Sequence, residues 1–149
     1  MTRYLVVCLG NICRSPIGEG CIRHVAMVRG LRVKVSSAGT SGYHVGSAPD
    51  KRSVAAMCEV GIDISGQRSQ KFTRADFQKF DRILVMDRSN LSDVVAMARS
   101  EEEREKVALF DPSGAEVPDP YYGGEGGFAA VREQVRAAAE AQLRSDFPG

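Results

Sequence analysis

Stretches of consecutive apolar residues alternate along the chain with stretches in which apolar residues recur every three or four positions. The first apolar stretch, residues 4–9, reads Tyr-Leu-Val-Val-Cys-Leu without a polar interruption. A parallel strand that is covered on both faces has this continuous pattern. Shorter apolar runs predict three further strands, over residues 31–36, 82–86 and 107–110.

The segments between these strands carry helix signals. Ser15-Pro16 predicts a helix start, with the serine as the cap and the proline at the first helical position. Apolar residues then recur at helical spacing as far as Gly30; they are Ile17, Cys21, Val25 and Val28. Further helices are predicted over residues 50–60, 73–80, 89–98 and 128–143, with a loop over 38–49 and a solvated charged face over 99–106.

This alternation of strands and helices predicts the α/β class. Right-handed crossovers between parallel strands produce a doubly wound sheet with helices on both faces. The chain has 149 residues, 43% of them hydrophobic, so we expect residues 1–149 to form a single domain with a buried core. One segment, residues 111–127, holds three prolines and five glycines. Long structureless segments in compact domains tend to be functional.

Charge and cysteine usage narrow the expected partners. Twenty Lys and Arg against 19 Asp and Glu leave +1, so we expect neither nucleic acid nor a membrane as a partner. Residues 1–52 nevertheless carry +6 (eight Lys and Arg minus two Asp and Glu), which indicates a local anion site. The four cysteines are too few for a disulfide scaffold and lack zinc-site spacing. We therefore expect a reduced, cytoplasmic protein without a metal or other cofactor.

A candidate anion site lies in the turn that joins the first strand to the first helix. This turn, residues 8–16, reads Cys-Leu-Gly-Asn-Ile-Cys-Arg-Ser-Pro. Gly10 and Asn11 tolerate backbone conformations that most residues avoid, so successive N–H groups can point inward as an anion nest. The helix adds the positive end of its dipole. Arg14 supplies a planar fork for two oxygens of a tetrahedral anion.

The same turn also predicts a nucleophile. Cys8 stands at the centre of this positive field, which favours its thiolate and activates it for attack. Ser15 can donate a hydrogen bond to that thiolate and later to a leaving sulfur. The turn is not an ATP-type phosphate loop, because the second glycine and the Lys-Ser/Thr pair are missing.

Several motifs beyond this turn make the chain similar to the low-molecular-weight protein tyrosine phosphatases. They are Ser37-Ala-Gly-Thr40, Tyr43-His-Val-Gly46, Gly61-Ile-Asp-Ile-Ser-Gly66, Thr73-Arg-Ala-Asp-Phe77, Met86-Asp-Arg-Ser-Asn90 and Asp119-Pro-Tyr-Tyr-Gly123. The resemblance implies a four-stranded parallel sheet of order 2-1-3-4, with the site at the carboxyl end of the first strand. It also implies hydrolysis of a tyrosine-phosphorylated protein or peptide through a phosphocysteine, with phosphate or other oxyanions as inhibitors.

The resemblance assigns roles to individual residues. The nucleophile falls on Cys8, the phosphate clamp on Arg14 and the general acid and base on Asp119. The phosphate-binding positions are Leu9, Gly10, Asn11, Ile12, Cys13, Arg14 and Ser15, and the aromatic walls around the substrate ring are Tyr43, Tyr121 and Tyr122.

Other positions take supporting roles by the same resemblance. Ser37 pairs with Asn11 to hold the loop open, and Asp87 is a further supporting residue. Cys13 matches a second loop cysteine that can form a disulfide with Cys8 under oxidation. The chain departs from many relatives at Gln67, where a histidine helps to brace the loop.

Three alternatives remain beside the phosphatase. An arsenate reductase on the same fold needs two further cysteines, and residues 59–149 contain none. In the phosphoarginine phosphatase branch, the position of Ile12 tends to be Thr and the Asp-Pro pair is followed by Phe-Gly. A phosphocysteine carrier or a non-hydrolytic phosphate binder would not need both Arg14 and Asp119. The sequence favours an aryl phosphate as substrate.

Overall fold

A parallel four-stranded sheet forms the centre of the computed structural model, which describes residues 1–124 and 126–148. The strands are β1 (Thr2–Cys8), β2 (Val33–Gly39), β3 (Arg82–Val85) and β4 (Val107–Leu109). Their order is β2-β1-β3-β4, and every pairing is parallel, which confirms the predicted sheet. The chain turns to opposite sides of β1 to form β2 and β3, so the carboxyl end of β1 is a topological switch point.

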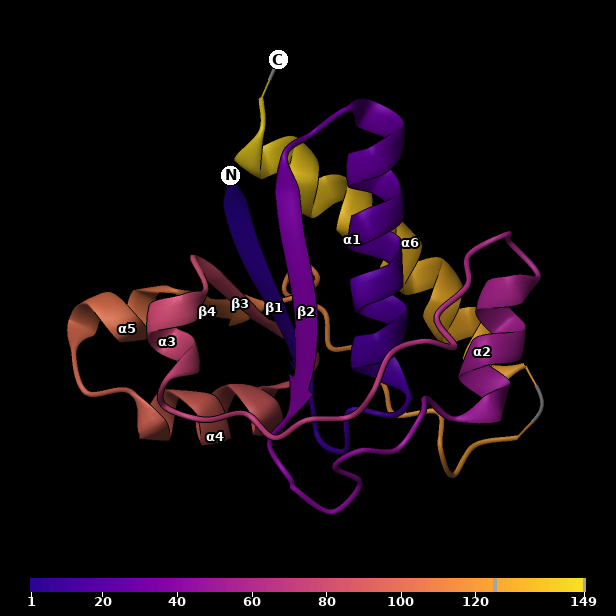
Figure 1. The fold of residues 1–149 in the computed structure, drawn as a ribbon, viewed down its shortest axis with the longest axis horizontal. Helices are drawn as coiled ribbons and strands as arrows, with labels where there is room; N and C mark the ends of the chain where they lie inside the picture. The colour runs from indigo at the N-terminus through magenta and orange to yellow at the C-terminus, as the bar shows by residue number, and fades with distance from the viewer. Residues whose placement is uncertain (125, 149) are drawn as a thin grey trace.

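Helices cover both faces of the sheet (Figure 1). One face carries α1 (Arg14–Arg29), α2 (Lys51–Cys58) and α6 (Gly127–Asp146). The other carries α3 (Asp76–Lys79), α4 (Arg88–Met97) and α5 (Glu101–Glu105). No helix among the described residues has both the length and the apolar composition needed to cross a membrane.

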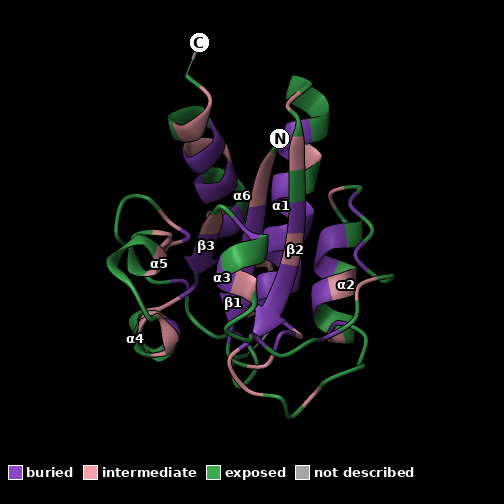
Figure 2. Ribbon diagram, turned by 60° about the vertical axis from the view of Figure 1, so that its left-hand side comes forward, coloured by how far each residue is buried: buried purple, intermediate pink, exposed green. Residues whose placement is uncertain are grey.

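The continuous apolar pattern of β1 is explained by burial on both faces. Tyr4, Val6 and Cys8 belong to the core beneath α1 and α6, while Leu5 and Val7 belong to the core beneath α3 and α4. In Figure 2 the strand is buried along most of its length, and the exposed residues lie on the outer surfaces of the helices and in the loops. This double burial fixes the end of β1, where the candidate chemistry begins.

The predicted start of the first helix was wrong in its detail. Helix α1 begins at Arg14, with Cys13 as N-cap and no side-chain cap bond. Ser15 is therefore the second helical residue, and its hydroxyl contacts Cys8 and Asn11 instead of capping the helix. At the other end, Gly30 adopts the left-handed conformation (φ 66°), as its predicted role as helix stop requires.

Three other local expectations also differ from the structure. The charged stretch 99–106 contains the helix α5, which Ser100 caps by accepting from the Glu103 amide; it buries no side chain, so only its solvation was predicted. Val28 is 68% exposed because it lies in the last turn of α1, off the buried face. Strand β2 extends to Gly39, where its register with Cys8 brings it beside the candidate site.

Candidate active site

The loop between β1 and α1, residues 8–15, has its carbonyl groups bound to the surrounding protein. We call it the Cys8 loop. The carbonyl oxygens of Cys8, Leu9 and Ile12 accept from the amides of Thr40, Ser41 and Asp50, at 3.0, 2.9 and 2.8 Å. Those of Gly10 and Cys13 accept from the hydroxyls of Ser69 and Ser53. None of the amides of residues 9–13 donates to another described residue. The free N–H groups can therefore converge on an anion.

Asn11 holds this loop in shape. It is the one non-glycine residue with a positive φ (55°) in the described chain, and it is 2% exposed. Its Oδ1 accepts from the amide of Gln70 at 2.9 Å, which orients the side-chain amide. Its Nδ2 then donates to Ser15 Oγ at 2.7 Å and to Ser37 Oγ at 2.9 Å.

A directed chain of hydrogen bonds ends at Cys8. Ser37 donates its hydroxyl proton to Glu19 Oε1 at 2.7 Å, because the carboxylate can only accept. Ser37 and Ser15 therefore both accept from Asn11, which leaves the Ser15 proton free. Ser15 Oγ lies 3.1 Å from Cys8 Sγ. The free hydroxyl proton of Ser15 therefore lies within hydrogen-bond distance of a thiolate at Cys8.

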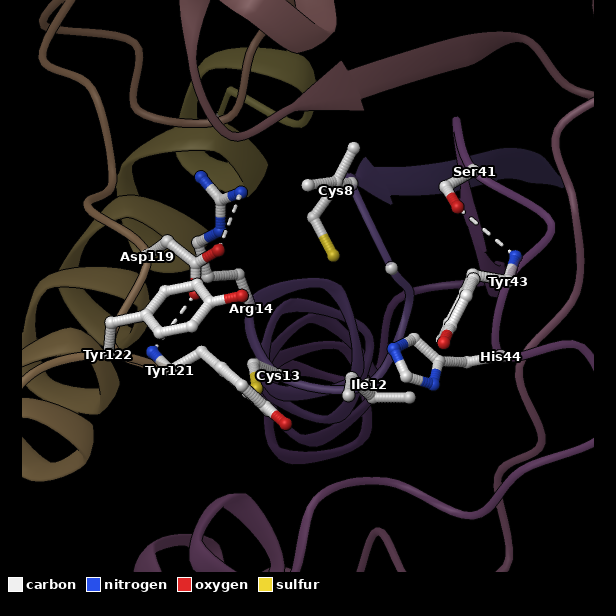
Figure 3. Close-up of a pocket in the computed structure, with 12 residues that line it drawn as sticks. Cys8, Ile12, Cys13, Arg14, Ser41, Tyr43, His44, Asp119, Tyr121 and Tyr122 are labelled. Carbon is white, nitrogen blue, oxygen red and sulfur yellow. Dashed lines mark hydrogen bonds and ion pairs between the residues drawn. The ribbon is translucent and has the colours of Figure 1, made fainter.

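Arg14 is buried against fixed partners. Its side chain is 3% exposed, and its Nη1 donates to Asp87 Oδ2 at 2.6 Å and to the Val117 carbonyl at 2.9 Å. Asp87 is itself fixed, because its Oδ1 accepts from the Asn90 amide as the N-cap of α4. Nη2 lies 3.8 Å from Asp119 Oδ2. One edge of the guanidinium is anchored, and the other faces the pocket (Figure 3).

A pocket of about 460 Å³ opens above Cys8. Its floor is the Cys8 loop, and the Cys8 sulfur points into it (Figure 3). Tyr43 and His44 stand on one side, and Asp119, Tyr121 and Tyr122 stand on the other. Tyr43 and Tyr122 are 87% and 90% exposed, so a ligand ring between the walls would bury surface that now faces solvent.

The segment that carries Asp119 is anchored at its start. We call residues 117–124 the Asp119 loop. Val117 donates its amide to Met86 and accepts from Arg14, which fastens the loop to the end of β3. Asp119 Oδ1 accepts from the Tyr121 amide at 3.0 Å. Its other oxygen, Oδ2, faces Arg14 across the pocket.

The structure brings the other candidate residues of the sequence to the site as follows. Leu9, Gly10, Ile12 and Cys13 line the pocket, and burial raises the pKa of the Cys13 thiol to about 12. Gln67 donates to the Pro16 carbonyl at 3.1 Å, so it braces the first turn of α1. Of the two remaining cysteines, Cys21 is buried and Cys58 is exposed.

Several residues around the site were missed from the sequence. His44 lines the pocket, and its imidazole lies over the position where Gly10 lacks a side chain. Glu19, Ser69 and Gln70 hold the Cys8 loop through the bonds given above. His44 lay within a quoted motif, and Asp50 was the predicted start of a helix; neither signal indicates a contact with the loop. Among residues 1–124 and 126–148, no group of three or more His, Cys, Asp or Glu side chains converges as a metal site.

Known proteins are similar to this chain over nearly its whole length. The family described as "Low molecular weight phosphotyrosine protein phosphatase" matches residues 3–145. The human protein named low molecular weight phosphotyrosine protein phosphatase is 39% identical over 146 residues, 93% of this chain and 92% of that protein. A protein tyrosine phosphatase from Entamoeba histolytica superposes with a TM-score of 0.91 at 32% identity, covering 98% and 97% of the two chains.

A third relative has been solved with a bound phosphonate. Wzb from Vibrio vulnificus, solved in complex with benzylphosphonate, superposes with a TM-score of 0.88 at 30% identity, covering 97% and 98% of the chains. The family match, the relatives and the shared fold define a protein tyrosine phosphatase. The chain belongs to the low molecular weight protein tyrosine phosphatase family.

Proposed function

We propose that the chain hydrolyses phosphotyrosine in two steps, with Cys8 as the nucleophile. In the first step the Cys8 thiolate attacks phosphorus, and the bond from phosphorus to the phenolic oxygen breaks. The phenolate is a poor leaving group, so protonated Asp119 gives its proton to that oxygen as the bond breaks. The products of this step are free tyrosine hydroxyl and a phosphocysteine at Cys8.

In the second step water attacks the phosphocysteine. The Asp119 carboxylate takes a proton from the water, the bond from sulfur to phosphorus breaks, and inorganic phosphate forms. The Ser15 hydroxyl is placed to donate to the departing sulfur, because Asn11 leaves its proton free. The cycle returns Cys8 to the thiolate and Asp119 to the acid, so atoms and charge balance.

The observation that carries this proposal is the arrangement of the Cys8 loop around one sulfur. The carbonyls of Cys8, Leu9, Gly10, Ile12 and Cys13 are bound by surrounding groups and the amides of residues 9–13 are free, while Arg14 presents a buried, anchored guanidinium. Donors fixed in advance stabilise the charge that develops on the transferring phosphoryl group without reorganising at the moment of reaction. The same donors would hold phosphate or another tetrahedral oxyanion as an inhibitor.

The pocket walls support an aryl ester as substrate. A phenyl ring entering between Tyr43 and Tyr122 gains about 0.5–1.5 kcal/mol per aromatic pair beyond area burial. A phosphoserine side chain is too short to bring its phosphorus to the floor between such walls. The benzylphosphonate bound by Wzb has a phenyl ring one atom away from its phosphorus, as an aryl phosphate does.

The same site geometry gives less support to the alternative functions that the sequence left open. Asp119 faces the pocket beside Arg14, whereas a phosphocysteine carrier has no use for a group that hydrolyses its own phosphoryl cargo.

A nucleophilic thiolate also needs a reducing environment, so we place the enzyme in the cytoplasm, as its four free cysteines suggest.

A substrate panel tests the proposal. Initial rates are measured with phosphotyrosine, phosphoserine and phosphoarginine peptides and with arsenate as an electron acceptor. Phosphotyrosine should exceed phosphoserine in kcat/KM by at least about a hundredfold, and Tyr43→Ala should reduce this preference mainly through KM. Equal rates on phosphoserine or phosphoarginine, or thiol-dependent arsenate reduction, would contradict it.

A further inference from the structure

Arg52, in the first turn of α2, contacts the Asp119 loop directly and is joined to the Cys8 loop through Asp50, and it does not line the pocket. Its guanidinium grips the Asp50 carboxylate as a fork, with Nε to Oδ1 and Nη2 to Oδ2 both at 3.0 Å. The remaining nitrogen, Nη1, donates to the Tyr121 carbonyl at 3.2 Å. All three guanidinium nitrogens are therefore engaged, two on α2 and one on the Asp119 loop.

Two aromatic rings lie beside the same guanidinium. Its central carbon lies 5.1 Å from the centre of the Tyr121 ring and 4.5 Å from that of Phe128, in the first turn of α6. Both distances lie within the range of cation–π attraction. Arg52 thus packs between the end of the Asp119 loop and the helix that follows it.

The other end of this connection reaches the Cys8 loop. The Asp50 amide donates to the Ile12 carbonyl at 2.8 Å, and Ser53 Oγ contacts the Cys13 carbonyl at 3.4 Å. Asp50 also caps α2 by accepting from the Arg52 amide. A short path of direct contacts therefore runs from Ile12 through Asp50 and Arg52 to Tyr121.

The Asp119 loop has few other restraints after Asp119. Residues 118–119 and 121–124 are exposed, and the Tyr121 amide is bonded to Asp119 itself. Within the part of the chain that the structure describes, Arg52 makes the only side-chain hydrogen bond to a backbone group of residues 118–124 from outside the loop. Losing it would remove this restraint from the backbone two residues from Asp119.

We propose that Arg52 is a positioning residue that sets where Asp119 stands relative to the Cys8 loop. This inference rests on the proposed role of Asp119 as the proton donor. Arg52 itself touches neither the pocket nor the reacting atoms. Its planar fork is required, because a lysine ammonium is a point donor that cannot hold Asp50 in the same bidentate way while bonding Tyr121.

The test compares leaving groups. kcat/KM is measured with phenyl phosphate, whose leaving oxygen must be protonated, and with dinitrophenyl phosphate, whose leaving oxygen need not be. Arg52→Met should lose roughly tenfold on phenyl phosphate, because small displacements of a reacting group are costly, and less than about twofold on dinitrophenyl phosphate. Arg52→Lys should fall between Arg52→Met and the wild type.

Two controls separate positioning from other effects. Lys51→Met removes a positive charge from the same turn of α2 at an exposed position and should change neither rate by more than about twofold. In an Asp119→Asn background, Arg52→Met should cause no further loss on phenyl phosphate, because the two residues act on one proton transfer. Thermal unfolding of each variant checks folding, and Arg52→Lys carries the test if Arg52→Met does not fold.

The outcomes that overturn the inference are distinct from those that overturn the function. Equal losses on both substrates, the same loss in Lys51→Met, or additive losses with Asp119→Asn would each show that Arg52 does not act through Asp119. A wild type that hydrolyses neither ester, or an Asp119→Asn variant with no loss specific to phenyl phosphate, would instead contradict the proposed function.

Discussion

Replacing Asn11 with alanine should damage both stability and catalysis, because Asn11 organises the Cys8 loop. The substitution removes three hydrogen bonds, of which those to Ser15 and Ser37 are buried and that from the Gln70 amide is partly buried. At about 1 kcal/mol each, these contribute about 3 kcal/mol to the free energy of unfolding. Alanine at the φ of 55° adds about 1 kcal/mol of strain, since asparagine tolerates the left-handed region better.

The expected total is about 3–5 kcal/mol, measured by urea unfolding followed by circular dichroism. For a chain of this size, that corresponds to a fall in Tm of roughly 6–20 °C. Ser37→Ala breaks one of the Asn11 bonds and the bond to Glu19, so it should cost about 2 kcal/mol. Ser36→Ala, one residue away on β2, removes an exposed bond from the Gln70 side chain and leaves all three Asn11 bonds in place, so it serves as the control and should cost about 1 kcal/mol or less.

Activity should fall with stability in the same order. Without Asn11, the Ser15 proton is no longer directed to Cys8, and the loop amides are no longer held in one orientation. We therefore expect kcat/KM to drop roughly 10- to 100-fold. If Asn11→Ala lost less than about 1 kcal/mol, or matched Ser36→Ala in both stability and rate, the network would not be what holds the loop.

Three further predictions concern other groups. Asp119→Ala should lower kcat by roughly 10²–10⁴ on phenyl phosphate and far less on dinitrophenyl phosphate, and an equal loss on both would limit Asp119 to shaping the loop. Peroxide should oxidise Cys8 to a sulfenic acid, which Cys13 attacks with release of water to form a disulfide that mass spectrometry detects. Because burial raises the pKa of the Cys13 thiol to about 12, the disulfide should form faster at pH 9 than at pH 7. After oxidation, Cys13→Ala should regain little activity when thiol is added. Burial and the bond to Asp146 raise the pKa of Tyr4 above its usual value near 10. The unfolded chain therefore releases this proton at lower pH than the folded chain, and the free energy of unfolding should fall above about pH 10. Tyr4→Phe should reduce that fall, and an unchanged pH profile of stability would exclude Tyr4 as its source.

Elements with strong local signals could be predicted from the sequence. The apolar run of β1, the stop at Gly30 and the periodic face of α6 follow from burial and backbone preference, which act over a few residues. The helix α5 was missed because its residues are all charged, so it has no periodic pattern of apolar residues. Only the cap from Ser100 to Glu103 marks it.

The supporting contacts of the site could not be predicted, because they join distant segments. Ser15 reads locally as a cap, yet Cys8 and Asn11 use its hydroxyl. Glu19 and Ser37 are 18 residues apart, and Arg52 and Tyr121 are 69 apart. Such pairs arise only when the sheet order brings β2, α2 and the Asp119 loop around the end of β1.

Trapping the covalent intermediate tests the central claim most directly. Wild-type enzyme is mixed with a phosphorus-labelled aryl phosphate, quenched in acid within milliseconds, digested and examined by mass spectrometry. The label should appear on Cys8 alone, it should accumulate further in Asp119→Ala during hydrolysis of dinitrophenyl phosphate, and Cys8→Ser should show neither label nor turnover. A label on any other residue, or turnover by Cys8→Ser above the level of a mock preparation, would contradict the account.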